Sequence, residues 1–423
     1  MRIILFFFIA AASFESVSAQ APLERRLADI CSILSGQSMQ FDTVFTSDFL
    51  RQVPPMQLTV LVQQITKESG GCTSARIVEP QSQFRAKAEA LTINGYTIPI
   101  SIAVTTLPPH RIEGLFFKPP IKASANLTEV LRDLNVLPGS TSIFAKNLTT
   151  GAVLASSDTS SYLPIGSSFK LFVLGELVRS IKHGEHRWDE VIVLDSTRFS
   201  FPSGILQTWP HGAPVTLHTL ASQMISISDN TATDVLLNYL GERAVQNIQR
   251  QMGHSKPELN DPFLSTRQLS ILKFSDNGSK ATTYASLNAR DRMVLLNTLA
   301  TASSNDVHFI DSPVLPDKVE WFARTPDLVR AMDWLRIESQ DQKAEHLRGV
   351  LGINPGLDIN RKVWSYVGYK GGSESGVLNM TYLLRHKNGE WYAISASWMR
   401  TDAAVELVIL AGLIERAIQL LAP

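Results

Sequence analysis

The sequence predicts an α+β protein of two domains, and three observations support this interpretation. After residue 71, short alternating apolar runs follow two helical segments. The proline pairs Pro108-Pro109 and Pro119-Pro120 then interrupt the chain. Beyond them, strand patterns occur at both ends of a long segment whose middle is helical. We therefore expect an accessory domain over residues 20–122 and a larger domain over residues 126–423.

The first domain is expected to contain helices followed by an antiparallel meander. Residues 24–36 and 55–67 carry apolar side chains at helical spacing. Strand patterns then cover residues 75–78, 84–93, 96–104 and 111–117. Asn94-Gly95 predicts a hairpin turn between the middle two, so this part reads as a small α+β domain.

The second domain is expected to have strands at both ends. A hairpin is predicted over residues 142–148 and 153–156, and helical patterns extend from residue 167, with a first helix over 167–183, to about residue 340. Strand patterns return at 363–370, 378–385 and 390–398, and a final helix covers 403–421. That helix carries three charged residues, which indicates amphipathic packing and not a membrane span.

The N-terminus has the features of a secretory signal. Arg2 precedes the apolar run Ile3 to Ala12, and small residues lead to Ala19, so residues 1–19 are expected to be removed. An uncleaved anchor needs about 20 apolar residues, more than this run has. Export to the periplasm or medium favours a disulfide between Cys31 and Cys72, with buried free thiols as the alternative.

The overall charge favours a small-molecule or peptide ligand. The chain has 39 Lys and Arg against 39 Asp and Glu, so no bulk positive charge would draw it to nucleic acid or to an anionic membrane. His183 and His186 are three residues apart, but no second ligand pair at zinc spacing accompanies them. No metal and no cofactor are indicated.

Three short motifs carry chemistry: Ser167-Ser-Phe-Lys170, Ser228-Asp-Asn230 and Lys370-Gly-Gly372. Residues i and i+3 share one face of a helix, so Lys170 can reach the Ser167 hydroxyl. The start of a helix favours a developing alkoxide there. A lysine crowded by a second cation, such as Lys370, can lose its proton and act as a base.

Similar motifs elsewhere test this interpretation. Ser270-Ile-Leu-Lys273 and Ser275-Asp-Asn277 repeat the first two motifs, but their serines are only five residues apart. That spacing is too short to place them on two elements facing one cleft. Lys387-Asn-Gly389 is better explained as a hairpin turn. Simpler interpretations of the first set are a polar helix start at Ser167, a helix N-cap at residues 228–230 and a solvated strand end at Lys370.

With these motifs, residues 126–423 resemble the serine β-lactamases and penicillin-binding proteins, most closely the class A β-lactamases. The similarity rests on "LPIGSSFKLFVLGEL", "MISISDNTATDVLL" and "VGYKGGSESGV". It implies an antiparallel sheet flanked by helices, with a helical subdomain. Ser167 would be acylated, Lys170 would take its proton, and Ser228 would relay a proton to the leaving nitrogen. The resemblance further implies that Asn230 holds the substrate amide, Lys370 and Gly372 border the substrate carboxylate, and the amides of Ser167 and Ser373 form an oxyanion hole.

The chain departs from the class A pattern in two ways. Gly371 replaces the usual Thr or Ser, which removes one hydroxyl contact to the substrate carboxylate. Where class A enzymes have Glu-Pro-x-Leu-Asn, this chain has Lys256-Pro-Glu258-Leu-Asn260, so a lysine occupies the position of the deacylating base. Glu258 could compensate only if the loop is rearranged, and turnover of a β-lactam acyl-enzyme is expected to be slow. The extra length before Lys370 is expected around residues 261–284.

The two-domain layout resembles serine hydrolases of clavulanic-acid biosynthetic clusters, which have a cone-shaped steroid-isomerase-like domain first. That resemblance implies esterase activity on cephalosporin side chains. Two further residues are candidates for ligand contact: Trp209 by stacking, with ordinary packing as the alternative, and Arg400 by pairing with a carboxylate, with a surface position as the alternative. Three functions stay open: hydrolysis of β-lactams or related acyl compounds, the same chemistry on D-alanyl peptides or esters, and non-catalytic β-lactam binding.

Overall fold

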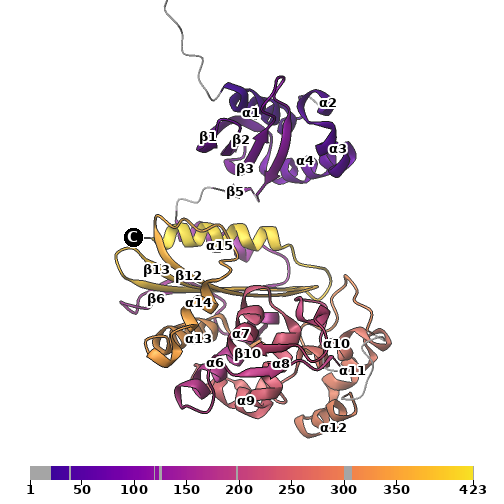
Figure 1. Ribbon diagram of the computed structural model, residues 1–423, viewed down its shortest axis with the longest axis vertical. Helices are drawn as coiled ribbons and strands as arrows, with labels where there is room; N and C mark the ends of the chain where they lie inside the picture. The colour runs from indigo at the N-terminus through magenta and orange to yellow at the C-terminus, as the bar shows by residue number, and fades with distance from the viewer. Residues whose placement is uncertain are drawn as a thin grey trace, which may run out of the picture. The chain divides into compact units, whose positions relative to one another are not determined.

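The protein is described from a computed structural model that covers residues 21–37, 40–118, 120–122, 126–196, 199–299 and 307–422. The chain divides into two compact units, residues 1–123 and 124–423 (Figure 1). The predicted signal peptide lies outside the described residues. No helix in the described ranges combines the length and the apolar character that crossing a bilayer requires.

The N-terminal unit packs four helices against an antiparallel sheet. Its elements are α1 (Ala21–Leu34), α2 (Phe41–Val44), α3 (Ser47–Gln52), α4 (Pro55–Ser69), β1 (Cys72–Ser82), β2 (Arg85–Thr92), β3 (Tyr96–Val104), β4 (Ile112–Phe117) and β5 (Ile121–Lys122). The strand order is β1-β2-β3-β4, and β5 pairs with β3. The predicted helices and meander are thus present, and Asn94-Gly95 forms the β2–β3 turn. The steroid-isomerase-like assignment stays a prediction.

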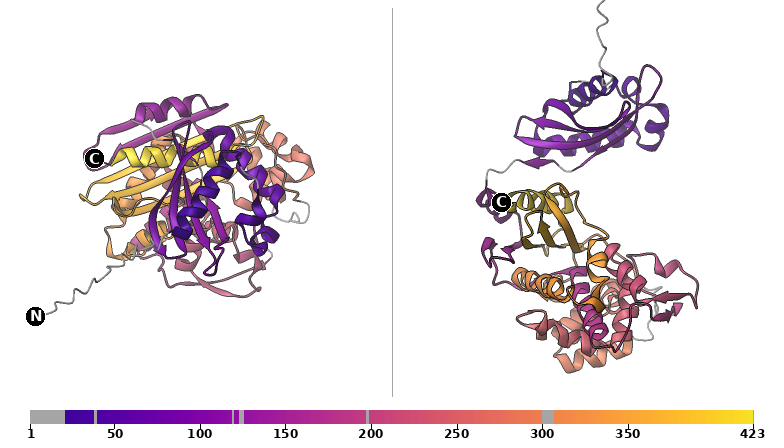
Figure 2. Two further views of the ribbon diagram at one scale, coloured as in Figure 1. Left: turned by 90° about the horizontal axis from the view of Figure 1, so that it is seen from above. Right: turned by 60° about the vertical axis from the view of Figure 1, so that its left-hand side comes forward.

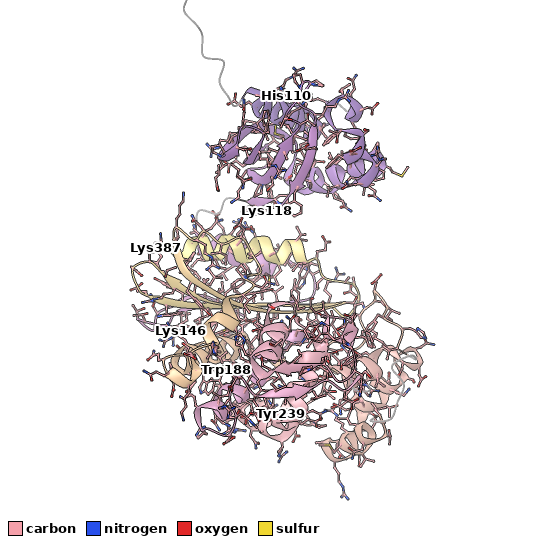
Figure 3. All side chains as sticks on the ribbon, in the orientation of Figure 1. His110, Lys118, Lys146, Trp188, Tyr239 and Lys387 are labelled. Carbon is pink, nitrogen blue, oxygen red and sulfur yellow. A yellow bond between two sulfur atoms is a disulfide. The ribbon has the colours of Figure 1, made fainter. Side chains whose placement is uncertain are left out.

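Two links fix α1 in this unit. A disulfide joins Cys31 on α1 to Cys72 at the start of β1, which confirms the predicted pairing. The buried Arg26 guanidinium donates hydrogen bonds to the carbonyls of Pro109 and His110, the latter labelled in Figure 3. Because burying a charge without hydrogen bonds is costly, these contacts and the ion pair with Asp29 account for its position.

The C-terminal unit encloses a five-stranded antiparallel sheet between helical layers. Its strands are β6 (Ser140–Asn147), β7 (Val153–Ser157), β8 (Leu163–Pro164), β9 (Val191–Val193), β10 (Pro214–Thr216), β11 (Phe322–Ala323), β12 (Trp364–Glu374), β13 (Val377–His386) and β14 (Trp391–Met399). The main sheet has the order β12-β13-β14-β6-β7. The strand pairs predicted at the two ends of this domain therefore meet in one sheet.

Helices cover both faces of that sheet. They are α5 (Leu127–Asn135), α6 (Lys170–Lys182), α7 (Leu217–Ser226), α8 (Asn230–Leu240), α9 (Glu242–Gln251), α10 (Thr266–Phe274), α11 (Ser279–Ser286), α12 (Ala289–Leu299), α13 (Thr325–Glu338), α14 (Leu347–Gly352) and α15 (Leu407–Leu421). Helices α5 and α15 pack on one face, while α6 and α13 pack on the other with the helical part beyond them (Figures 1 and 2).

Two predicted boundaries differ in ways that affect the site. The helix predicted over 167–183 starts as a 3-10 turn, Gly166–Phe169, and becomes α-helical only at Lys170. The strand predicted to end at Lys370 continues to Glu374, where it pairs with Val377 of β13. Gly372 lets the continued part of β12 lie against the turn that holds Ser167, because it has no Cβ.

Candidate active site

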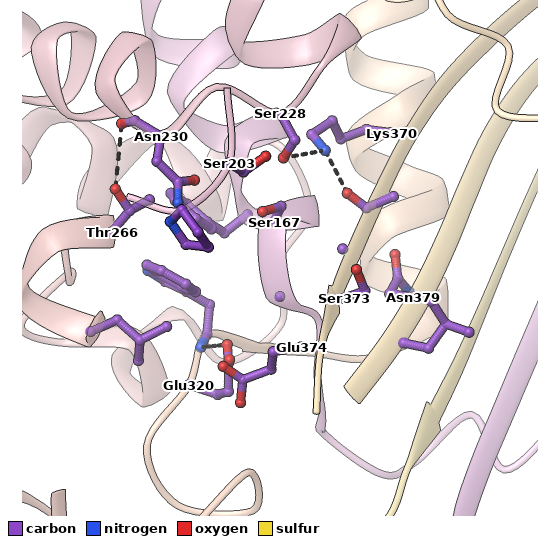
Figure 4. Close-up of a pocket in the computed structure, with 18 of the residues that line it drawn as sticks. Ser167, Ser203, Ser228, Asn230, Thr266, Glu320, Lys370, Ser373, Glu374 and Asn379 are labelled. Carbon is purple, nitrogen blue, oxygen red and sulfur yellow. Dashed lines mark hydrogen bonds between the residues drawn. The ribbon is translucent and has the colours of Figure 1, made fainter. Parts of the chain in front are cut away.

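Ser167 lies at the centre of a pocket of about 650 Å³ between the sheet and the helical layer. It belongs to the 3-10 turn that leads into α6, and its side chain is only partly buried. This turn supplies the first backbone amides at the N-terminal end of the helix, and partial positive charge accumulates at that end. Figure 4 shows Ser167 with residues from β12, α8 and the loop before α8 around it.

The Ser167 turn and the end of β12 are in direct backbone contact. A Cβ on Gly372 would lie 2.0 Å from the Ile165 carbonyl oxygen and 2.5 Å from the Ser167 nitrogen. A Cβ on Gly166 would lie 3.0 Å from the Ser373 nitrogen. Both positions therefore require glycine, and their approach brings together the two amides predicted to form the oxyanion hole.

The Lys170 amine is fully buried and points to the Ser228 loop. It lies 2.7 Å from the Ser228 carbonyl oxygen, 3.0 Å from the Ser228 Oγ and 2.7 Å from the Asn230 Oδ1. Burial, and after it the positive charge of Lys370, hold the pKa of Lys170 well below its usual value. An uncharged amine donates two of these hydrogen bonds and keeps one lone pair to accept a proton.

Lys370 approaches the same hydroxyl from β12. Its Nζ lies 3.1 Å from the Ser228 Oγ, and burial lowers its pKa to about 7. The Ser228 hydroxyl thus accepts hydrogen bonds from two buried amines, and Figure 4 shows the one from Lys370. Three side chains from three separate parts of the sequence are therefore joined by hydrogen bonds at this point.

The loop that carries Ser228 is strained and held in place. Ser228 has φ of 58°, in the left-handed region that non-glycine residues rarely adopt. The Asp229 carboxylate accepts hydrogen bonds from the amides of Ile205, Leu206 and Ala232, and the last of these caps α8. The predicted N-cap is therefore real, but Asp229 provides it, which leaves Ser228 and Asn230 directed at the pocket.

A threonine lines the pocket beside Asn230, in a position that the motifs did not predict. The Thr266 Oγ1 donates to the Asn230 carbonyl at 3.4 Å. The amides of Thr266 and Arg267 both donate to the buried Asp234 carboxylate, at 2.8 and 2.9 Å. Asp234 thereby fixes the start of α10 against α8 and holds the Thr266 hydroxyl at the site.

The predicted deacylation segment lies elsewhere. Neither Lys256 nor Glu258 lines the pocket: Lys256 is exposed, and Glu258 pairs with Arg250 at 3.6 Å. Asn260 is buried and bonded to Gln249 and to the Phe322 backbone. The segment forms a 3-10 turn against α9 and β11, so the loop rearrangement that Glu258 would need to reach the pocket is absent.

The carboxylates that do line the described pocket are Glu320 and Glu374, and both contact Lys273. Figure 4 shows the two acids together, across Ser167 from Ser228 and Lys370. Burial and the neighbouring Glu320 charge raise the pKa of Glu374 to about 8, although Lys273 opposes this. Burial lowers the pKa of Lys273, but the Glu374 and Glu320 charges outweigh it and raise that pKa.

The sequence provided a partial signal for this cluster. Lys273 ends the second S-x-x-K, and Ser270 of that motif lines the pocket as well. The lysine of this second motif is held in an ion pair with the two acids, so the motif differs from the Ser167 centre although Ser270 lines the same pocket. Glu320 and Glu374 stand outside any motif, and only the fold brings them together.

The remaining predicted ligand residues lie away from the pocket. Trp209 packs partly buried against the core of the helical layer, which matches the ordinary-packing alternative. Arg400 pairs with Asp402 at 2.8 Å, and neither residue lines the pocket.

At Gly371, the space that a Thr or Ser side chain would use is filled by the Tyr369 hydroxyl, 2.1 Å from a Cβ built on the glycine.

Comparison with known proteins agrees with this geometry. Residues 122–307 match the model of the β-lactamase enzyme family. A search of curated proteins finds no match. Among solved structures, the chain is similar to a β-lactamase from Sphaerobacter thermophilus, with 18% identity and a TM-score of 0.51 over 70% of this chain and 95% of that one.

Two further structures show the same fold. A β-lactamase from Chitinophaga pinensis is 15% identical with a TM-score of 0.50, covering 70% of this chain and 97% of its own. A mutant class A β-lactamase of the last common ancestor of Gram-negative bacteria is 15% identical with a TM-score of 0.51, covering 70% and 99%. The predicted resemblance to class A β-lactamases is thus confirmed, and the C-terminal unit has a β-lactamase-like fold.

Proposed function

We propose that this protein is an exported serine hydrolase that β-lactams or related amide and ester compounds acylate at Ser167. The observation that carries the proposal is the convergence of two buried lysines, Lys170 and Lys370, on the Ser228 hydroxyl beside Ser167. Both lysines have lowered pKa values, so a neutral amine is available as a base near neutral pH.

The reaction follows from these contacts. The Ser167 Oγ attacks the acyl carbon while its proton passes to the Lys170 amine. The carbonyl oxygen becomes an oxyanion that the amides of Ser167 and Ser373 stabilise. The carbon–nitrogen or carbon–oxygen bond then breaks, and the leaving atom receives a proton through Ser228. Water later cleaves the Ser167 ester and releases the acid.

Deacylation is the step for which this site is least equipped. Of the described residues, the carboxylates lining the pocket are Glu320 and Glu374, and Lys273 binds both. The hydroxyl beside Asn230 belongs to Thr266, which is a poor base at neutral pH. This favours a second candidate: an esterase or D-alanyl peptidase whose β-lactam adducts persist, or a β-lactam-binding protein without turnover.

Export is part of the proposal. The apolar run before Ala19 supports it, and so does the Cys31–Cys72 disulfide, since such bonds persist in oxidising compartments. Comparing the precursor and mature masses of the expressed protein, together with its cell fraction, tests this. An intact N-terminus at Met1 in the cytosol would contradict export.

The chain supplies a matched control for the acylation test. Fluorescent penicillin should label the wild type, Ser167→Ala should abolish labelling, and Ser270→Ala should retain it. Both serines line the pocket, but the lysine of the Ser270 motif is held in an ion pair, whereas the pKa of Lys170 is lowered. Labelling that persists in Ser167→Ala would overturn the mechanism.

Three substrates then separate the candidates. Nitrocefin, a D-alanyl-D-alanine peptide and a simple ester are assayed in parallel with the lifetime of the penicillin label. Loss of label within seconds would contradict slow deacylation. A stable label with rapid ester or peptide hydrolysis supports the second candidate in its enzymatic form, and a stable label without any turnover supports the binding protein.

A further inference from the structure

Part of the wall of the pocket that holds Ser167 is apolar. Eleven of the lining side chains are apolar. The apolar arm is the part of the pocket that Leu269, Phe274, Phe309 and Ile310 line. A pocket of about 650 Å³ has room for more than the small acyl group that acylation alone requires.

The wall of the apolar arm is fixed at both of its ends. The His308 amide donates to the Phe274 carbonyl at the end of α10, at 2.8 Å, and the Phe309 and Phe274 rings lie 5.0 Å apart. Further along, the Ser375 hydroxyl donates to the Asp311 carbonyl at 2.5 Å. Residues 308–311 are therefore bonded to the end of α10 at one end and to the β12–β13 turn at the other. These contacts fix the positions of Phe309 and Ile310.

Four of the apolar side chains that line the pocket, two of them in the apolar arm, are more exposed than apolar residues of a folded domain usually are. Phe309 is 44% exposed and Ile310 is 49% exposed, and Ile227 at 42% and Leu407 at 56% line the same pocket. Exposed apolar side chains gathered at one concave place mark a binding site, because a ligand that covers them removes apolar surface from water.

Charged side chains lie on both sides of Ser167. Lys370 lies at the Ser228 side, whereas Glu320 and Glu374 lie across Ser167 from it (Figure 4). The buried Lys273 contacts both acids. With Glu374 protonated at neutral pH, one lysine balances one carboxylate, so this side carries no net charge that would repel a hydrocarbon.

We infer that the preferred substrates are acyl compounds with a large hydrocarbon side chain, alkyl or aryl, which lies in the apolar arm while the reacting carbonyl is at Ser167. This inference rests on the proposed function, since it names the substrate class of the same site. Its physical basis is the burial of apolar surface, which lowers the free energy of the bound substrate and of the transition state together.

The test is a chain-length series of p-nitrophenyl esters from acetyl to octanoyl, with the acylation burst of p-nitrophenol as readout. In the wild type, the second-order acylation constant should rise about threefold to fourfold for each buried methylene. Phe309→Ser and Ile310→Ser should reduce the octanoyl-to-acetyl ratio at least about tenfold, because a serine withdraws several methylene-sized contacts.

Matched controls lie outside the pocket. Phe116→Ser and Ile337→Ser change side chains that are 62% and 50% exposed and should leave the ratio unchanged. A flat series in the wild type, or an equal loss in the control variants, would overturn the inference.

Binding without chemistry separates this inference from the proposed function. Titration calorimetry of Ser167→Ala with acetate, hexanoate and decanoate measures the apolar arm alone. Tighter binding of the longer acids supports the inference if the Ile310→Ser substitution abolishes the difference. This holds even if no ester acylates the wild type, and that absence of acylation would overturn the proposed function. Equal affinity for all three acids would overturn the inference even where penicillin labels Ser167.

Discussion

Lys170 and Lys273 are a natural comparison, because each is the last residue of an S-x-x-K motif and each is fully buried on a helix beside the same pocket. Their surroundings are opposite. Lys170 faces neutral oxygens and the cation of Lys370, and its pKa is lowered. Lys273 faces two carboxyl groups, and its pKa is raised. The motif thus places a lysine near a serine, but the groups contributed by other elements decide whether that lysine is a base or a cation.

The largest expected effect is on acylation by Lys170→Met. Losing the base should slow acylation of Ser167 about 10³-fold, in the range of general-base catalysis. The free energy of unfolding should stay within about 1 kcal/mol, because the lost hydrogen bonds and the relieved burial of an amine oppose each other. Stopped-flow labelling and urea unfolding measure the two quantities. Acylation within tenfold of the wild type would show that Lys170 is not the base.

Lys273→Met should show the reverse pattern. Removing the cation leaves Glu320 and Glu374 buried without a partner, which should cost about 3–5 kcal/mol of folding free energy. Urea unfolding of the full chain measures it, with each domain's transition fitted separately. Lys280→Met is the matched control, because its ion pair with Asp276 is far more exposed and should contribute less than about 1 kcal/mol. Equal costs in the two variants would contradict the assignment of a buried ion cluster.

Glu374→Gln tests the same cluster through pH. The folded pKa of Glu374, about 8, lies above the ordinary value of 4.5, so the folded protein holds an extra proton between these values. The stability of the wild type relative to the variant should therefore fall by about 5 kcal/mol as pH rises from 4.5 to 8 and stay constant above, because one pKa unit corresponds to about 1.4 kcal/mol. Unfolding curves at several pH values check the sign. A difference that grows with pH would refute it.

The smallest effect concerns the pH profile of Lys370→Met. The Lys370 charge lowers the pKa of Lys170. Its removal should therefore shift the rise of the acylation rate with pH toward higher pH, and the rate at pH 7 should fall a few-fold. A neutral ester without a carboxylate is the substrate, so that loss of carboxylate binding does not enter. Lys146→Met, at the β6 strand away from the pocket, is the control. An unchanged pH profile would mean that the two lysines do not interact.

Much of the fold could be predicted from local patterns. Alternating apolar residues and the Asn94-Gly95 turn identified the N-terminal meander, and the two strand groups of the C-terminal domain were found at residues 142–156 and 363–398. Both predictions rest on periodicity, which a strand needs wherever it is placed. The spacing of Ser167, Ser228 and Lys370 was informative for the same reason: the turn before a helix, a loop and a strand are local features that can carry chemistry, although the strand continues past Lys370 to Glu374.

The sequence alone could not locate the deacylation side of the site. Lys256 and Glu258 match a family segment by letter, yet the segment lies against α9 and β11, while α10 brings Thr266 to Asn230. The packing of α10 against α8 determines this, and it is a long-range property without a local signal. Glu320 and Glu374 were missed because a single acid on a strand or loop looks like surface charge until its partners are known.

By itself, the sequence determined which residue types are available and how the nucleophile is presented, because helix starts, strand periods and glycine positions depend on neighbouring residues. The tertiary structure alone decided the charge state of each buried lysine, the position of Thr266 and the apolar arm. Electrostatic interaction and burial depend on distance in space. Ser228 is 58 residues from Lys170 and 142 from Lys370, so these groups acquire their chemistry only when the sheet and helices bring them together.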